Sequence, residues 1–238
     1  MHRVESRTRR SYTERVPKRS SRDAQTLKVR LDALVLATDG AARREADPVG
    51  FVHAYTDTRD RELVGLVASS LAFGNVTAIR TSVSRALAVL GERPSAYARE
   101  TPETTLASQY AGFVHRVYRG NHLARLIANA GALQRTHGTL GAYFASLLAA
   151  SDNALEPALI TFADALRGPS PEPGLRHLVP DPRAGSACKR LLLYLRWMIR
   201  PDDGVDLGLW PISPSLLVIP VDTHIHRIAK NLRLTDRN

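Results

Sequence analysis

The stretch GSACKRLLLYLRWMIR at residues 185–200 decides the predicted fold. Its small residues predict a turn, and its apolar residues then recur every three or four positions, which is typical of a helix with one buried face. That face consists of Leu191, Leu192, Leu195, Met198 and Ile199. We therefore predict a helix over residues 187–200, which Pro201 ends. After a proline-rich loop, the stretch VDTHIHRIAKN predicts a second helix that begins at Asp222.

The same helical period recurs along most of the chain, and no segment shows the alternation of a strand or a hairpin dipeptide. A weak helix is predicted near residues 104–110, and five prolines between residues 168 and 183 predict a long irregular connection. The stronger helices are predicted over residues 24–38, 61–73 (with Asp60 as the N-cap), 76–90, 121–136, 139–150 and 157–166. These patterns predict an all-α fold with about eight to ten helices.

The positive charge is concentrated at the N-terminus. Residues 1–30 hold ten Lys and Arg against three acids, a net charge of +7, and the remaining 208 residues contribute only +3 of the total of +10. We predict a disordered basic tail over residues 1–23 and a helical domain over residues 24–238. Such a tail contacts nucleic-acid phosphates in some proteins and only increases solubility in others, and the composition favours neither role.

Several classes of protein are excluded by what the sequence lacks. It has no run of eighteen apolar residues and no secretory signal, so we expect no membrane contact and a cytoplasmic location. The single Cys188 excludes both an intrachain disulfide and an iron–sulfur cluster bound by four cysteines. The sequence does not indicate an oligomeric state.

We also expect no metal ion and no cofactor. His224 and His226 are two positions apart, so they point to different sides of a helix and do not form a zinc pair. We interpret Asp202, Asp203 and Asp206 as solvated loop acids, with Asp206 a candidate cap. There is no Walker loop, no GxGxxG and no GxSxG motif.

Two residues at predicted helix starts are candidates for catalysis. The positive end of the helix dipole disfavours an ammonium at Lys189 and makes the neutral amine, the form that attacks an electrophilic carbon, more accessible. Asp222, held ionised as an N-cap, could stabilise a developing cation or assist proton transfer. Taken alone, Lys189 is better explained as a surface lysine, and Asp222 as an ordinary helix cap. Arg196 and Arg200 share a helix face with Lys189 and are candidate phosphate contacts.

Short motifs in these stretches resemble a known family. VDTHI, followed by Arg227 and Ile228, resembles the VDTHV-x-RV signature of the helix-hairpin-helix GPD DNA glycosylases, and the turn from Gly185 to Lys189 resembles the hairpin that precedes it. DPVGFVHAY, SSLAFGN, GSACKRLLLYLRWM and VDLGLW resemble a bacterial family of uncharacterised conserved proteins that is distantly related to those glycosylases. The second likeness covers residues 26–238, whereas the glycosylase likeness covers residues 185–231.

The resemblance implies an all-helical, two-lobed fold that binds DNA between its lobes. A lysine in bifunctional members forms a Schiff base with C1′ of the damaged nucleotide while an aspartate assists, and Lys189 and Asp222 match these positions. The damaged base is flipped out of the duplex. Gly185 matches the hairpin that contacts a phosphate, and Asn75 matches a polar residue that fills the gap left by the flipped base. A turn-forming Gly-Asn pair explains Asn75 equally well.

There are also departures from the glycosylase pattern. Ala187 stands where the hairpin usually has a second glycine, and the Lys189 to Asp222 separation of 33 residues is long. The archaeal 8-oxoguanine DNA glycosylases have a similarly long segment here and are nearest in layout. Relatives continue with further helices beyond the one at Asp222, so the resemblance implies that this chain lacks its last helices and exposes apolar surface.

The expected function is thus a DNA glycosylase/AP lyase of base-excision repair, with an oxidised purine as the candidate lesion. The alternatives are a DNA-binding protein of the same fold without catalysis, and an inactive truncated product.

Overall fold

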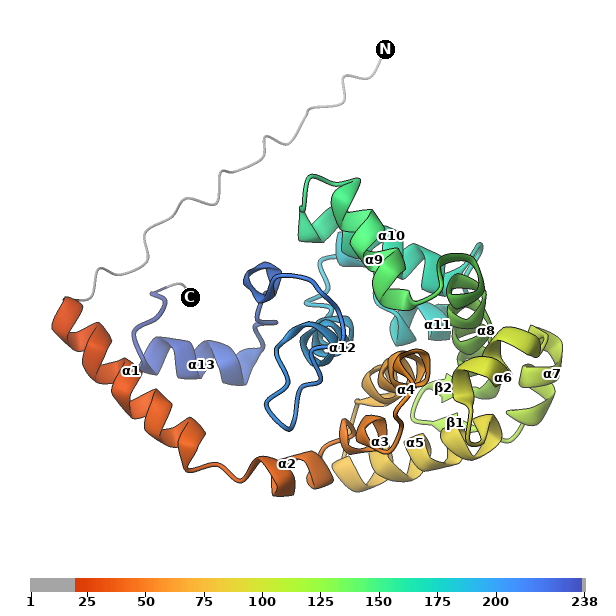
Figure 1. Cartoon of the computed structure of the whole chain (residues 1–238), viewed down its shortest axis with the longest axis horizontal. Helices are drawn as coiled ribbons and strands as arrows, with labels where there is room; N and C mark the ends of the chain where they lie inside the picture. The colour runs from red at the N-terminus through yellow and green to blue at the C-terminus, as the bar shows by residue number, and fades with distance from the viewer. Residues whose placement is uncertain (1–19, 237–238) are drawn as a thin grey trace, which may run out of the picture. The chain divides into compact units, whose positions relative to one another are not determined.

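The computed structural model describes residues 20–236 of the chain (Figure 1). The chain divides into two compact units. The larger one comprises residues 39–220, and the smaller one comprises the residues before and after them. The predicted tail lies outside the described residues except for residues 20–23. Residues 21–23 already belong to the first helix, α1 (Ser21–Leu36), which therefore begins three residues before its predicted start.

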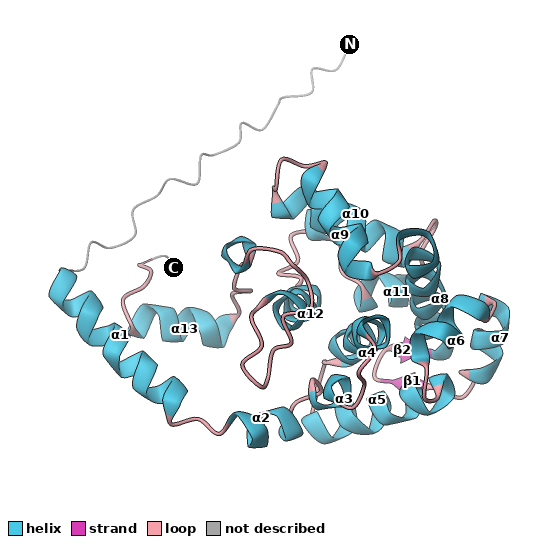
Figure 2. Ribbon diagram, in the orientation of Figure 1, coloured by secondary structure: helices cyan, strands magenta, loops and turns pink. Residues whose placement is uncertain are grey.

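The larger unit is built almost entirely of helices (Figure 2), which confirms the prediction of an all-α class. Its two strands have two residues each and form one antiparallel hairpin, which the sequence did not predict because such short strands show no alternation. The helices are α2 (Gly40–Ala46), α3 (Gly50–His53), α4 (Thr58–Leu71), α5 (Val76–Leu90), α6 (Pro94–Glu100), α7 (Glu103–Gln109), α8 (Gly120–His137), α9 (Leu140–Ala149), α10 (Leu155–Arg167), α11 (Pro173–Leu178) and α12 (Lys189–Ile199). The strands are β1 (Val114–His115) and β2 (Tyr118–Arg119), and the 3-10 helices are η1 (Pro182–Ala184) and η2 (Pro214–Leu216).

Helix α11 corrects the predicted irregular connection over residues 168–183. Pro173 occupies the first turn of this helix, where a missing N–H removes no intrahelical hydrogen bond. The prolines therefore begin a short helix here instead of excluding one. The prediction for the start of α4 was also wrong, because Asp57 caps this helix and Asp60 lies in its first turn. The Asp60 carboxylate instead accepts a hydrogen bond of 2.7 Å from the Ser95 N–H.

Helix α4 is the centre of the larger unit and packs against α3, α5, α6, α8, α9 and α12 (Figure 1). Small residues permit the close crossings. At Gly65, an added Cβ would lie 2.7 Å from Met198 Cε on α12. At Gly131, where α8 meets α6, it would lie 2.3 Å from the Ala98 carbonyl oxygen. All described residues that are buried lie between Pro48 and Trp210.

A fully buried carboxylate joins four parts of this core. Glu62 on α4 accepts hydrogen bonds from the backbone N–H groups of Leu140 and Gly141, both at 2.8 Å, at the start of α9. It also accepts one of 2.8 Å from Trp210 Nε1 and one of 3.2 Å from Gln134 Nε2 on α8. Burial raises the pKa of the Glu62 carboxyl, and the four N–H donors oppose that rise.

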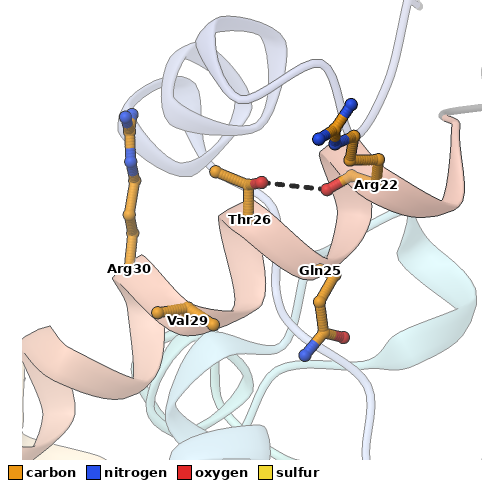
Figure 3. Close-up of a pocket in the computed structure, with 5 residues that line it drawn as sticks. All are labelled: Arg22, Gln25, Thr26, Val29 and Arg30. Carbon is orange, nitrogen blue, oxygen red and sulfur yellow. Dashed lines mark hydrogen bonds between the residues drawn. The ribbon is translucent and has the colours of Figure 1, made fainter.

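The smaller unit contains α1 and α13 (Thr223–Asn231), and none of its described residues is buried. Apolar side chains of α1 are exposed, including Val35 and Leu36. A hollow on α1 is lined by Arg22, Gln25, Thr26, Val29 and Arg30, and Figure 3 shows Arg22, Thr26 and Arg30 projecting from one side of the helix. Among residues 20–236, no helix is both long and apolar enough to cross a membrane.

Candidate functional site

Lys189 is the first residue of α12 and is exposed to solvent. The turn before it contains two residues with left-handed backbone, Gly185 with φ 72° and Cys188 with φ 46°. The Cys188 N–H donates a hydrogen bond of 3.2 Å to Ser186 Oγ, and the buried Cys188 side chain anchors the turn to the core. This turn places Lys189 in the first turn of the helix, as the sequence predicted.

The next residue, Arg190, belongs to a group of basic and aromatic side chains. We call Phe73, Arg116, Tyr118, His177 and Arg190 the cation–aromatic cluster. The guanidinium of Arg190 lies 5.7 Å from the centre of the Phe73 ring and 5.5 Å from that of the Tyr118 ring. The guanidinium of Arg116 lies 4.9 Å from the centre of the Phe73 ring. Such distances are typical of cation–π interactions.

Hydrogen bonds hold the members of the cluster in place. The Tyr118 hydroxyl and His177 Nδ1 are 2.9 Å apart, and Arg190 donates a hydrogen bond to the His177 carbonyl oxygen. The backbone of Phe73 is held by His115, whose Nε2 lies 3.2 Å from the Phe73 carbonyl oxygen. The other ring nitrogen of His115 lies 2.8 Å from Ser82 Oγ on α5, so this histidine ties the end of α4 to the hairpin and to α5.

The cluster carries positive charge that no carboxylate balances. Among residues 20–236, neither Arg116 nor Arg190 forms an ion pair with an aspartate or glutamate. Burial lowers the pKa of Arg190 to about 10. Its Nη1 is buried without a hydrogen-bond partner. An anion beside this guanidinium would favour its charged form.

The two other arginines of α12 are already paired. Arg196 Nε lies 3.1 Å and Arg200 Nη1 lies 2.9 Å from Asp206 Oδ2, and Arg200 Nη2 lies 3.3 Å from Asp203. Asp206 is fully buried, so its interpretation as a solvated loop acid was wrong. Burial raises the pKa of the Asp206 carboxyl, although both guanidinium groups oppose this rise. A phosphate bound by Arg196 or Arg200 would have to compete with Asp206.

The remaining predicted site residues are helix caps. Asp222 Oδ1 accepts a hydrogen bond of 2.7 Å from the Ile225 N–H at the start of α13. Asn75 Oδ1 accepts one of 2.9 Å from the Thr77 N–H at the start of α5. Asp222 belongs to the smaller unit, whereas Asn75 and Lys189 belong to the larger unit. Within the larger unit, Asn75 lies two residues after Phe73, and Lys189 directly precedes Arg190.

The part of the chain that the structure describes contains no group of three or more His, Cys, Asp or Glu side chains that could bind a metal ion. The acidic side chains of the loop after α12, Asp202, Asp203 and Asp206, interact with arginines and backbone N–H groups instead.

The sequence prediction did not include the cation–aromatic cluster. Its five members come from four segments, and only the fold brings them together. Two signals were present. Phe73 is the aromatic residue of the SSLAFGN stretch, and Arg190 follows the candidate nucleophile directly. Neither signal indicates the contact between them, because 117 positions separate the two residues in the sequence.

Comparison with curated proteins and with solved structures finds no match for the chain. A family model does match residues 47–238, which cover the larger unit from the residue after α2 onward, together with α13. The family's description is "Protein of unknown function (DUF2400)". Because the match extends over most of the chain, the protein belongs to the DUF2400 family.

Proposed function

We propose that the protein is a DNA glycosylase/AP lyase of the base-excision type, with Lys189 as its nucleophile. The observation that carries this proposal is the exposed amine of Lys189 at the N-terminus of α12, next to a basic and aromatic surface in the same unit. The motif resemblance at Lys189 and Asp222 supports the choice of reaction. The candidate lesion is an oxidised purine, by analogy with the archaeal 8-oxoguanine DNA glycosylases.

The chemistry requires a neutral amine beside C1′ of an extrahelical nucleotide. The Lys189 amine adds to C1′ as the glycosidic bond breaks, and the departing base takes the bonding electrons and a proton from Nζ. The sugar ring then opens, O4′ takes the bonding electrons and a proton from water, and a protonated Schiff base remains between Lys189 and the sugar. Asp222 has the role of stabilising the positive charge that develops on the sugar and of assisting the proton transfer. The hydrogen bond from the Ile225 N–H keeps this carboxylate in a fixed orientation.

The phosphate contacts follow from the charges. Arg116 and Arg190 have no carboxylate partner among the described residues, so they are better candidates than the paired Arg196 and Arg200. Gly185 and Asn75 remain proposed DNA contacts from the resemblance, and both are exposed.

Borohydride trapping on DNA that contains 8-oxoguanine or an abasic site tests this proposal, because reduction makes a Schiff base permanent. We expect the wild type to form a covalent complex, Lys189→Gln to form none, and the matched Lys28→Gln variant on α1 to trap like the wild type. If the wild type and Lys189→Gln trap equally poorly, the lyase proposal is wrong.

A second candidate function is DNA binding without catalysis. The unbalanced charge of the cation–aromatic cluster favours it, since DNA binding needs cations and no nucleophile. This function predicts salt-dependent binding to DNA, equal in the wild type and Lys189→Gln apart from the effect of one charge, with no trapped product.

A further inference from the structure

We propose that the cation–aromatic cluster binds single-stranded DNA, with an unpaired base stacked on Phe73 and backbone phosphates bound by Arg116 and Arg190. The identity of the polymer as DNA rests on the proposed function. The preference for an unpaired base rests on the cluster itself and goes beyond that function.

The exposure of Phe73 is the first argument. Its side chain contacts Tyr118, His177 and two arginines, yet it remains 38% exposed. A phenylalanine that served only the core would be covered, as Tyr118 is. An exposed ring fixed by its neighbours is ready to stack on a base at little entropic cost.

The arrangement of the cations is the second argument. Arg116 is exposed at the turn of the β1–β2 hairpin, where it has φ 54°, and it packs against the loop that carries Phe73. An added Cβ at Gly74 would lie 3.0 Å from Arg116 Cδ. Arg190 reaches the same ring from α12. Two guanidinium groups beside one aromatic ring match the alternation of phosphate and base along a single strand.

The cluster also favours unpaired bases over paired ones. In a duplex, the faces of the bases are covered by their neighbours, so a protein ring cannot stack on them without unstacking the DNA. The cluster has no carboxylate or amide side chain to read the edge of a base, and we assign its two guanidinium groups to phosphates. It therefore suits the face of an unpaired base and is indifferent to which base that is.

Fluorescence anisotropy with a labelled oligothymidylate tests this inference on the full chain. We expect Phe73→Leu, which keeps the apolar contact and removes the aromatic face, to bind about 10-fold more weakly than the wild type. Phe73→Trp keeps a stacking surface and should bind at least as tightly as the wild type. Arg116→Gln should lower the slope of log affinity against log salt by about 0.7, which corresponds to one phosphate contact on a single strand.

Arg85→Gln is the matched control for charge, since Arg85 lies 5.6 Å from the centre of the Phe113 ring and belongs to a separate cation–aromatic pair. It should leave the affinity and the salt slope close to those of the wild type. Thermal melts of all variants establish that they are folded. The inference is wrong if folded Phe73→Leu binds like the wild type, or if an unlabelled duplex competes as well as the single strand.

These outcomes are separable from those of the trapping experiment. Lys189→Gln retains the cluster and should still bind oligothymidylate. Failure of trapping together with weaker binding by Phe73→Leu would reject the lyase and retain the single-strand site. Successful trapping together with unchanged binding by Phe73→Leu would retain the lyase proposal and reject the single-strand site.

Discussion

Glu62 is a carboxylate that the core encloses completely. No cation pairs with it among the described residues, and its stabilisation comes from four N–H donors, two on each oxygen. Oε1 accepts from Gly141 and Trp210, and Oε2 accepts from Leu140 and Gln134. The residue thus fixes the start of α9 and the Trp210 loop to α4.

Glu62→Gln should therefore destabilise the protein, although glutamine has the same shape. Whichever way the amide is oriented, its NH₂ group faces two N–H donors that lose their acceptor. We expect a loss of about 2–4 kcal/mol in the free energy of unfolding, measured by urea denaturation. The exposed Glu92→Gln is the control and should change it by less than about 0.5 kcal/mol. Equal unfolding midpoints for the two variants would contradict the assigned role of Glu62.

His115 should make stability depend on pH. Burial lowers the pKa of its imidazole, so between the lowered value and the unfolded value of about 6.5 the unfolded state binds more protons. Stability then rises with pH through this window and is lost as the pH falls through it. The hydrogen bonds to Ser82 and the Phe73 carbonyl suit the neutral ring.

Urea unfolding at about pH 5 and about pH 7.5 measures this effect, since the two values bracket the unfolded pKa. In His115→Gln, which has no titrating ring, the difference in stability between the two pH values should be smaller than in the wild type. An unchanged difference would assign the pH dependence to other groups.

At the scale of elements, the sequence predicted the long helices well. The periodic apolar residues predicted α5, α8 and α12 correctly, because each of these helices buries one face. Some short elements were not predicted. Helix α6 (Pro94–Glu100), helix α11 and the β1–β2 hairpin contain too few residues to show a period, and contacts with neighbouring helices determine them.

Some features of the candidate site could likewise be predicted from the sequence, and others could not. The position of Lys189 at a helix start and the capping role of Asp222 follow from local sequence rules, and both could be predicted. The pairing of Arg196 and Arg200 with Asp206 could not, because the burial of Asp206 depends on how its loop packs on α12. The cation–aromatic cluster required the tertiary fold for the same reason.

The crossing of α8 and α6 provides a test at this scale. Gly131→Ala places a methyl group 2.3 Å from the Ala98 carbonyl oxygen, which is too close for a contact, so the two helices must separate. The higher helix propensity of alanine opposes this effect only partly. We expect a net loss of about 1–3 kcal/mol in the free energy of unfolding. Gly112→Ala has no atom within 4 Å of the added Cβ and should be neutral or slightly stabilising. Denaturant unfolding of both variants checks the contrast.

At the scale of the whole molecule, the two units differ in what they bury. The larger unit holds every described buried residue, including the Glu62 network and the cation–aromatic cluster, whereas the smaller unit holds none. A hydrophobic core is the main source of cooperative stability. Residues 39–220 thus contain what an independent fold requires, and they include Lys189 but not Asp222.

We therefore expect a fragment of residues 39–220 to unfold cooperatively, with a melting temperature within a few degrees of that of the full chain. Calorimetry measures this, and a broad transition without a heat-absorption peak would contradict it.

The same fragment separates the two proposed activities. It should bind oligothymidylate through Phe73, Arg116 and Arg190, because all three lie within it. It should trap damaged DNA much more weakly than the full chain, because the carboxylate of Asp222 is missing. Trapping by the fragment at the level of the full chain would remove Asp222 from the mechanism and leave Lys189 to act without it.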